Sequence, residues 1–120
     1  MQCQRIAFKT KKGIHLIDLA DLISVEADGN YVSLRQISSS HMLRDCISKI
    51  EERLDPCGFV RIHRSVLVNP AFVESIEPRP TGDYLLRVKG GKEYTVTRAY
   101  KKNLKFFAEL WIGAEGFVGE

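Results

Sequence analysis

This 120-residue sequence predicts a mainly β fold with minor α content. Short runs rich in β-branched and aromatic residues alternate with turn sequences that contain glycine, which is typical of antiparallel strands. Apolar residues at helical spacing occur in two places, one internal and one close to the C-terminus. We therefore expect one domain of antiparallel strands with an internal helix and a C-terminal helix.

The first half of the chain predicts two hairpins and a short fifth strand. The expected strands lie at 5–10, 14–18, 22–27, 31–37 and 41–44. The first pair flanks the turn from Lys11 to Gly13, and the second flanks Asp28-Gly29, a dipeptide that strongly favours hairpins. A brief helical turn is expected at 19–21 between the two hairpins.

One internal helix is predicted at 46–54. Its apolar residues fall at i, i+3 and i+7 and share one face. They are Ile47, Ile50 and Leu54. Asp45 is a residue type that caps helices, and Pro56 with Gly58 ends the segment.

The middle of the chain runs from a strand into an exposed polar corner. A strand is expected over 59–62, and Ser65 can cap a short turn at 66–69. His63 and Arg64 then lie at the junction between strand and turn and point outward.

A strand meander and a closing helix are expected to complete the chain. The strands lie at 72–78, 84–88 and 93–96. Thr97 can cap the closing helix, in which lysines lie opposite an apolar stripe. The stripe consists of Tyr100, Leu104, Phe107, Ala108 and Trp111.

Composition and cysteine usage indicate a cytoplasmic globular protein. Hydrophobic residues make up 44% of the chain, and 18 Lys and Arg against 15 Asp and Glu leave a net charge of +3. This charge permits a polyanionic partner without requiring one. The three cysteines form no CxxC pair, which fits reduced thiols, and neither a signal peptide nor a membrane-spanning run is present.

No pattern in the sequence supports an enzyme, a metal site or a cofactor. His63-Arg64-Ser65 resembles part of a kinase catalytic loop, but no aspartate follows Arg64 and the chain is too short for a kinase. A Cys57–His63 pair lacks an orienting acid. The histidines His15, His41 and His63 lack the spacing of metal ligands. The segment Gly90-Gly91-Lys92 lacks the remaining residues of a phosphate-binding loop.

Nucleic-acid contact suits the residues at the predicted turns better. Arg can donate two hydrogen bonds to guanine, and Asn can pair with adenine. The turn residues of these two types are Asn30, Arg64, Asn69 and Arg98. His63 and Ser65 can donate to phosphate. Solvated loop residues would show the same composition, so residue chemistry alone leaves both interpretations open.

Three ordered blocks resemble the LytTR family of bacterial DNA-binding domains. The blocks are 25–32, 59–69 and 94–98, and the resemblance extends from about Arg5 to about Leu110. It implies an elongated arrangement of small antiparallel sheets, with a domain at 5–112 and a flexible tail at 113–120. It also implies a transcriptional regulator, or the output domain of a two-component response regulator. No receiver segment precedes Arg5, so we expect either an excised output module or a stand-alone regulator.

Carried over to this sequence, the resemblance places base contacts at Asn30, Arg64 and Arg98. Four residues become candidates for contacts to the DNA backbone: His63, Ser65, Lys101 and Lys102. Asn69 is instead interpreted as a local cap for backbone groups. Residues expected in the core are Tyr31, Phe59, Val66 and Val68.

The implied mechanism is insertion of loops into the grooves of double-stranded DNA, with bending of the duplex. The implied target is a pair of direct repeats in a promoter, occupied by a possible homodimer. The main alternative is a β-rich interaction or dimerisation module that uses a sheet edge. RNA binding ranks last, because the phenylalanines lie in apolar strand patterns rather than on an exposed face.

Overall fold

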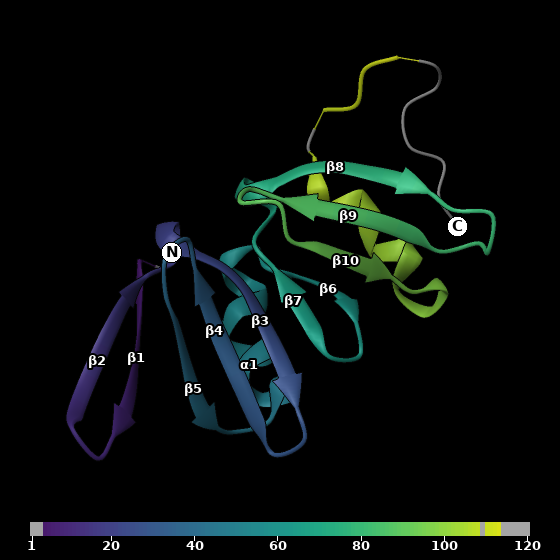
Figure 1. Ribbon diagram of the computed structural model, residues 1–120. Coiled ribbons are helices and arrows are strands. Elements are labelled where there is room, and N and C mark those ends of the chain that lie inside the picture. The colour runs from purple at the N-terminus through teal and green to yellow at the C-terminus, as the bar shows by residue number, and fades with distance from the viewer. Residues whose placement is uncertain (1–3, 109, 114–120) are drawn as a thin grey trace.

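The computed structural model describes residues 4–108 and 110–113 and contains three antiparallel sheets (Figure 1). The strands are β1 (Arg5–Thr10), β2 (Gly13–Asp18), β3 (Leu22–Asp28), β4 (Tyr31–Gln36), β5 (Ser40–Arg44), β6 (Val60–His63), β7 (Val66–Val68), β8 (Val73–Pro78), β9 (Tyr84–Val88) and β10 (Glu93–Val96). The helices are α1 (Ile47–Leu54) and the 3₁₀ helices η1 (Leu19–Asp21), η2 (Asp55–Cys57), η3 (Pro70–Phe72) and η4 (Arg98–Phe107).

A five-stranded sheet in the order β5-β4-β3-β7-β6 forms the middle of the molecule. The β1–β2 hairpin stands on one side of it, and the three-stranded sheet β10-β9-β8 lies on the other (Figure 1). The principal extents are 51 × 31 × 25 Å, so the molecule is elongated. The predicted fold class, small antiparallel sheets with few helices, is confirmed.

Two hydrophobic cores lie on opposite faces of the central sheet. The alternation of side chains along β7 sends Leu67 into one core and Val66 and Val68 into the other. The first core is completed by α1 and the β1–β2 hairpin, which contribute Ile47, Leu54, Phe8 and Ile17. The second is completed by the three-stranded sheet and η4, which contribute Leu86, Val88, Val96 and Leu104. The central sheet therefore buries both of its faces along β3 and β7.

The internal helix matches the sequence prediction closely. Ile47 and Leu54 are buried, and Gly58 ends the following turn with a φ of 94°, a conformation that favours glycine. The Asp45 carboxylate accepts a hydrogen bond of 2.7 Å from the Cys46 backbone N–H. The helix begins at Ile47, one residue later than predicted, with Cys46 at the cap position.

The predicted turn at 66–69 is wrong, because Val66–Val68 forms strand β7. β7 pairs with β6 on one side and with β3 on the other, and all three of its residues are buried. These two ladders satisfy the backbone of a segment too short to be recognised as a strand on its own. The polar corner is therefore the turn of a β6–β7 hairpin, and Ser65 belongs to that turn rather than capping a later one.

The closing helix starts after Thr97, as predicted, but ends at Phe107. Leu104 is buried in the second core, whereas Ala108 is exposed and Trp111 keeps 41% of its surface exposed. The apolar stripe is thus correct as far as Phe107 and wrong beyond it. The predicted flexible tail at 113–120 lies, except for Gly113, outside the described residues.

Two further expectations concern the redox state of the cysteines and the presence of a membrane-spanning helix. Cys46 is free and exposed, whereas Cys57 is disulfide-bonded, so the prediction of reduced thiols is wrong for Cys57. In the part of the chain that the structure describes, no helix has the length and apolar character needed to cross a membrane.

Candidate nucleic-acid interface

The three predicted base-reading residues lie at three separate bends and are all exposed. Asn30 lies in the turn between β3 and β4, Arg64 lies in the turn between β6 and β7, and Arg98 is the first residue of η4. The β3–β4 and β6–β7 turns point toward the same side of the molecule (Figure 1). The tips of these side chains are therefore accessible to a ligand.

Backbone hydrogen bonds hold these three bends next to one another. The N–H of Ala27 donates to the carbonyl of Ser65 at 2.8 Å, which joins the end of β3 to the β6–β7 turn. On the other side, the N–H of Thr97 donates to the carbonyl of Ile62 at 3.1 Å. The β6–β7 turn consequently lies between the other two bends. We call the row formed by Asn30, Arg64 and Arg98 the polar rim.

The β6–β7 turn presents donors on its outer side. The His63 ring accepts a hydrogen bond at Nδ1 from the backbone N–H of Ser65, at 3.0 Å. A neutral imidazole that accepts at Nδ1 carries its proton at Nε2, which is then a donor. His63 and Ser65 are both half-buried, and the Arg64 side chain is exposed between them. This turn can therefore offer an imidazole N–H, a hydroxyl and a guanidinium to an acceptor.

The guanidinium of Arg61 stabilises the same turn from the inside. Nε donates to the carbonyl of His63 at 2.8 Å, and Nη2 donates to the carbonyl of Arg64. Nη1 forms an ion pair with Glu51 of α1, with 2.6 Å between Nη1 and Oε1. Arg61 is a charged residue in the strand that leads into the polar corner, yet only 9% of it is exposed.

The start of η4 gathers three cations around a shallow hollow lined by Gly82, Arg98, Ala99, Lys101 and Lys102. Arg98 packs over Gly82, where a Cβ atom would come within 3.3 Å of Nε. Lys101 lies one 3₁₀ turn after Arg98, so the two side chains are on the same face. No acidic residue lies in the first turn of η4. The hollow therefore favours an anion.

Tyr31 was expected in the core, but 45% of its surface is exposed. It follows Asn30 at the start of β4, where side chains alternate between the two faces of the sheet, and the next residue, Val32, is the buried one. The prediction was wrong because apolar character alone does not tell which residue of an alternating pair faces the core. The other three residues expected in the core, Phe59, Val66 and Val68, are buried.

Asn69 has a structural role, as predicted. Its Oδ1 accepts from the N–H of Ala71 at 3.0 Å, which caps η3. Its Nδ2 donates to the carbonyls of Leu19 and Leu22 at 3.2 and 3.0 Å. Because three backbone groups use the carboxamide, Asn69 does not belong to the polar rim.

A polar network between the central and the three-stranded sheets was not predicted. The Tyr94 hydroxyl donates to the carboxylate of Glu26 and contacts Ser24 Oγ at 2.7 Å. Glu26 also pairs with Arg35 and Lys92, at 3.4 and 3.6 Å. Burial raises the pKa of the Tyr94 hydroxyl, and its hydrogen bond to Glu26 adds to this increase. The network connects the sheet that carries two of the bends to the sheet that precedes η4.

Metal binding finds no support in residues 4–108 and 110–113, which contain no group of three or more His, Cys, Asp or Glu side chains arranged to hold an ion. The exposed polar rim and the basic hollow are instead arranged to contact an extended anionic partner.

Comparisons with known proteins identify the family and the fold. Residues 12–108 match the LytTr DNA-binding domain family. A solved LytTr DNA-binding domain from Bacillus cereus superposes with a TM-score of 0.76 at 19% identity, covering 90% of this chain and 99% of that chain. That structure shares the fold.

Curated relatives are regulators from several bacteria. Sensory transduction protein LytT of Bacillus subtilis is 30% identical over 101 residues, 84% of this chain and 42% of that protein. The positive alginate biosynthesis regulatory protein of Pseudomonas aeruginosa is 36% identical over 97 residues, 79% of this chain and 39% of that protein. The chain spans about two fifths of the length of these relatives. With more than half of its residues matched by the family, the chain belongs to the LytTR family of DNA-binding domains.

Proposed function

We propose that this chain binds double-stranded DNA in a sequence-specific manner by inserting two turns into the major groove. Asn30 and Arg64 contact base edges there, while Arg98 reaches the adjacent groove. Arg is suited to guanine O6 and N7, and Asn to adenine N6 and N7, because each can form two hydrogen bonds with its base.

The observation that carries this proposal is the adjacency of the three bends. The hydrogen bonds from Ala27 to Ser65 and from Thr97 to Ile62 support a polar rim that acts as one surface. The exposure of all three rim side chains supports direct contact with bases. A recognition helix is not needed, because each reading residue is carried by a turn or by the first residue of a helix.

Contacts to the DNA backbone accompany the base contacts. His63 and Ser65 donate to phosphates beside the Arg64 position, and Lys101 and Lys102 contact phosphates near Arg98. The basic hollow at the start of η4 supports this assignment, because its positive charges neutralise phosphates without reading sequence. The phosphate contacts orient the domain and the base contacts select the sequence.

In the cell, we expect residues 5–112 to act as the DNA-binding domain of a cytoplasmic bacterial transcriptional regulator, such as the response regulator of a two-component system. Two copies bind direct repeats in a promoter as a homodimer on DNA, and they bend the duplex. Two linked binding events give an affinity that one small domain does not reach alone. The domain performs no catalysis, and it requires neither a cofactor nor a small-molecule substrate.

Selection of bound duplexes from a random pool tests the proposal. We expect enrichment of a consensus with two spaced repeats, and gel-shift titrations in which affinity falls steeply with salt. A pool that remains random after several rounds, together with binding that does not depend on salt, would contradict it. That outcome would favour the alternative, an interaction module that uses a sheet edge.

A further inference from the structure

Arg61 lies inside the molecule behind the polar rim, and its contacts extend to both sides of the Arg64 position. Its guanidinium holds the carbonyls of two consecutive residues, His63 at the end of β6 and Arg64 in the turn. A planar guanidinium donates in fixed directions, so these two bonds fix the orientation of both peptide groups. The direction in which the Arg64 side chain leaves the backbone is thereby set by Arg61.

The same residue contacts η4, which carries Arg98. The Arg61 carbonyl accepts a hydrogen bond from Asn103 Nδ2 at 2.9 Å, and its guanidinium carbon lies 5.7 Å from the centre of the Tyr100 ring. Tyr100 and Asn103 both belong to η4. Arg61 therefore links the turn that carries Arg64 to the helix that begins with Arg98.

The Arg61 charge is stabilised by an acid on a third element. Glu51 of α1 supplies the carboxylate, and its partner Nη1 is 2.6 Å away. A buried cation without such a partner would be costly, so the ion pair is what allows a guanidinium to occupy this position. Helix α1, the β6–β7 turn and η4 all meet at this one side chain.

We propose that Arg61 is a positioning residue that sets the spacing between Arg64 and Arg98 and thereby determines which DNA sequence is preferred. This inference rests on the proposed function. Because Arg61 is buried, it contacts no DNA itself and acts through the two exposed arginines. A lysine at this position would keep the charge but could not hold two carbonyls and a carboxylate in one plane.

The experiment compares specific with non-specific binding in an Arg61→Lys variant of the full chain. Affinity is measured by fluorescence anisotropy on the selected duplex and on a mixed-sequence duplex. We expect specific affinity to fall about 10- to 100-fold, because one bidentate base contact is lost or misplaced. Non-specific affinity and its salt dependence should stay unchanged, because the phosphate contacts remain. An unchanged ratio of specific to non-specific affinity would overturn the inference.

A stability control separates positioning from general loosening of the fold. Val88→Ala removes buried volume from the second core, at a residue that lies in β9 and outside the polar rim. We expect Val88→Ala to lower stability and to keep the ratio of specific to non-specific affinity. If Val88→Ala reduced the ratio as much as Arg61→Lys does, a positioning role would be refuted.

Two further variants keep the inference testable if Arg61→Lys folds poorly. Glu51→Gln leaves the turn intact but weakens the ion pair between Arg61 and α1. The ratio of specific to non-specific affinity should therefore fall, by a smaller factor than in Arg61→Lys. Combining Arg61→Lys with Arg64→Ala should change the preference at the Arg64 base pair no more than Arg64→Ala alone. If the wild-type chain selects no DNA sequence, the proposed function is refuted. If the wild-type chain selects a sequence and these variants keep the same preference, only the role of Arg61 is refuted.

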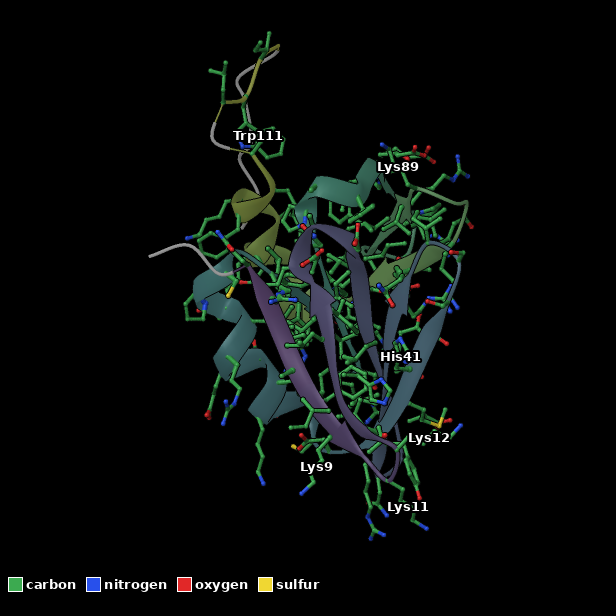
Figure 2. The ribbon with its side chains drawn as sticks, turned by 90° about the vertical axis from the view of Figure 1, so that its left-hand side faces the viewer. Lys9, Lys11, Lys12, His41, Lys89 and Trp111 are labelled. Atoms are coloured by element: carbon green, nitrogen blue, oxygen red, sulfur yellow. The ribbon has the colours of Figure 1, made fainter. Side chains whose placement is uncertain are left out.

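A second inference comes from the basic tip of the β1–β2 hairpin. Lys9, Lys11 and Lys12 are exposed, and among the described residues none of them forms an ion pair. Figure 2 shows them projecting from the lower end of the molecule. The turn of the β3–β4 hairpin, which carries Asn30, points to the same end (Figure 1).

Further cations lie between strand β1 and helix α1. A groove there is lined by Lys9, Arg44, Lys49 and Arg53, together with the acids Asp45 and Glu52. The cations in this lining outnumber the acids four to two. Arg44 is paired with Tyr31 across β4 and β5, next to the Asn30 turn. Positive charge thus continues from the polar rim to the hairpin tip.

We infer that the β1–β2 hairpin contacts phosphates of the duplex that flanks the sequence-read site. The longest extent of the molecule, 51 Å, corresponds to about 15 base pairs at roughly 3.4 Å per pair. A duplex that follows this axis from the polar rim extends beneath the hairpin. This inference also rests on the proposed function, but it concerns affinity rather than sequence preference.

Matched single substitutions test the hairpin. Lys11→Ala should lower the slope of log affinity against log salt by about 0.9, and Lys11→Ala with Lys12→Ala by about 1.8. Lys89, exposed on the β9–β10 turn at the opposite end (Figure 2), is the control, and Lys89→Ala should leave the slope unchanged. On a duplex shortened at the end next to the hairpin, wild type and the lysine variants should show the same slope of log affinity against log salt. Equal slopes for Lys11→Ala and wild type on the long duplex would overturn the inference and leave the proposed function intact.

Discussion

Replacing Tyr94 by phenylalanine tests whether the buried polar network fastens the three-stranded sheet to the central sheet. The substitution keeps the ring in the second core and removes only the hydroxyl. That hydroxyl donates to Glu26 and contacts Ser24 Oγ at 2.7 Å. Ser24 is fully buried, so its hydroxyl loses its partner, whereas Glu26 keeps Arg35 and Lys92.

The expected cost follows from the kinds of hydrogen bond that are lost. A bond to a charged acceptor contributes roughly 1.5 to 3 kcal/mol, and a neutral bond contributes about 0.5 to 1.5 kcal/mol. Because the two share one hydroxyl and do not add fully, we expect Tyr94→Phe to lower the free energy of unfolding by about 2 to 4 kcal/mol. Chemical denaturation followed by circular dichroism measures this difference directly.

The raised pKa of Tyr94 adds a dependence on pH. The unfolded chain loses the tyrosine proton near the ordinary pKa of 10.0, while the folded protein retains it to higher pH. The unfolded state therefore binds fewer protons above that pH, and stability falls as the pH rises. The stability that this group contributes is fully present below pH 10.0 and is lost above it.

The dependence on pH is tested by measuring the free energy of unfolding of wild type and Tyr94→Phe between neutral and alkaline pH. Wild type should lose stability above pH 10.0 more steeply than Tyr94→Phe does. Tyr100→Phe, at a half-buried ring in η4, controls for general effects of removing a tyrosine hydroxyl. The reasoning is refuted if Tyr94→Phe costs less than about 0.5 kcal/mol, which is the range of an ordinary surface substitution.

Three further predictions concern the polar rim and its surroundings. Arg64→Ala should cost about 1 to 3 kcal/mol in specific binding and relax preference at one base pair, with little change in stability, as measured by gel shift and thermal unfolding. Lys101→Ala should weaken binding to all sequences alike and lower the salt slope by about 0.9, as measured by anisotropy in a salt series. Asn69→Ala should lose about 2 to 4 kcal/mol of stability with its three backbone bonds, yet keep sequence preference, as measured by urea unfolding and duplex selection.

Local signals made most of the secondary structure predictable. The Asp28-Gly29 turn and the spacing of Ile47, Ile50 and Leu54 depend on residues close in sequence, and their structures match the predictions. Strand β7 escaped prediction because its three residues are stabilised by pairing with β3 and β6, which no local pattern reveals. The extent of η4 was overestimated because apolar residues continue after the helix ends at Phe107.

Features of the site that depend on distant partners could not be predicted. The burial of Arg61 requires Glu51, which lies ten residues earlier on a different element. The pairing of Tyr94 with Glu26 spans 68 residues. Residue types at the turns could be read from the sequence, whereas the supporting interactions behind them could not.

Strands β3 and β7 are buried on both faces, and this has a consequence for the stability of the domain. β3 and β7 contribute side chains to both cores, and each adjoins a turn that carries a residue of the polar rim. Trimming Leu54 or Leu86, one in each core, opens a cavity that lowers the stability of the whole domain, because the two cores share these strands. Substitutions on either side of the molecule, far from the polar rim, can therefore lower the temperature at which the rim loses its structure, without changing how its residues are arranged in the folded state.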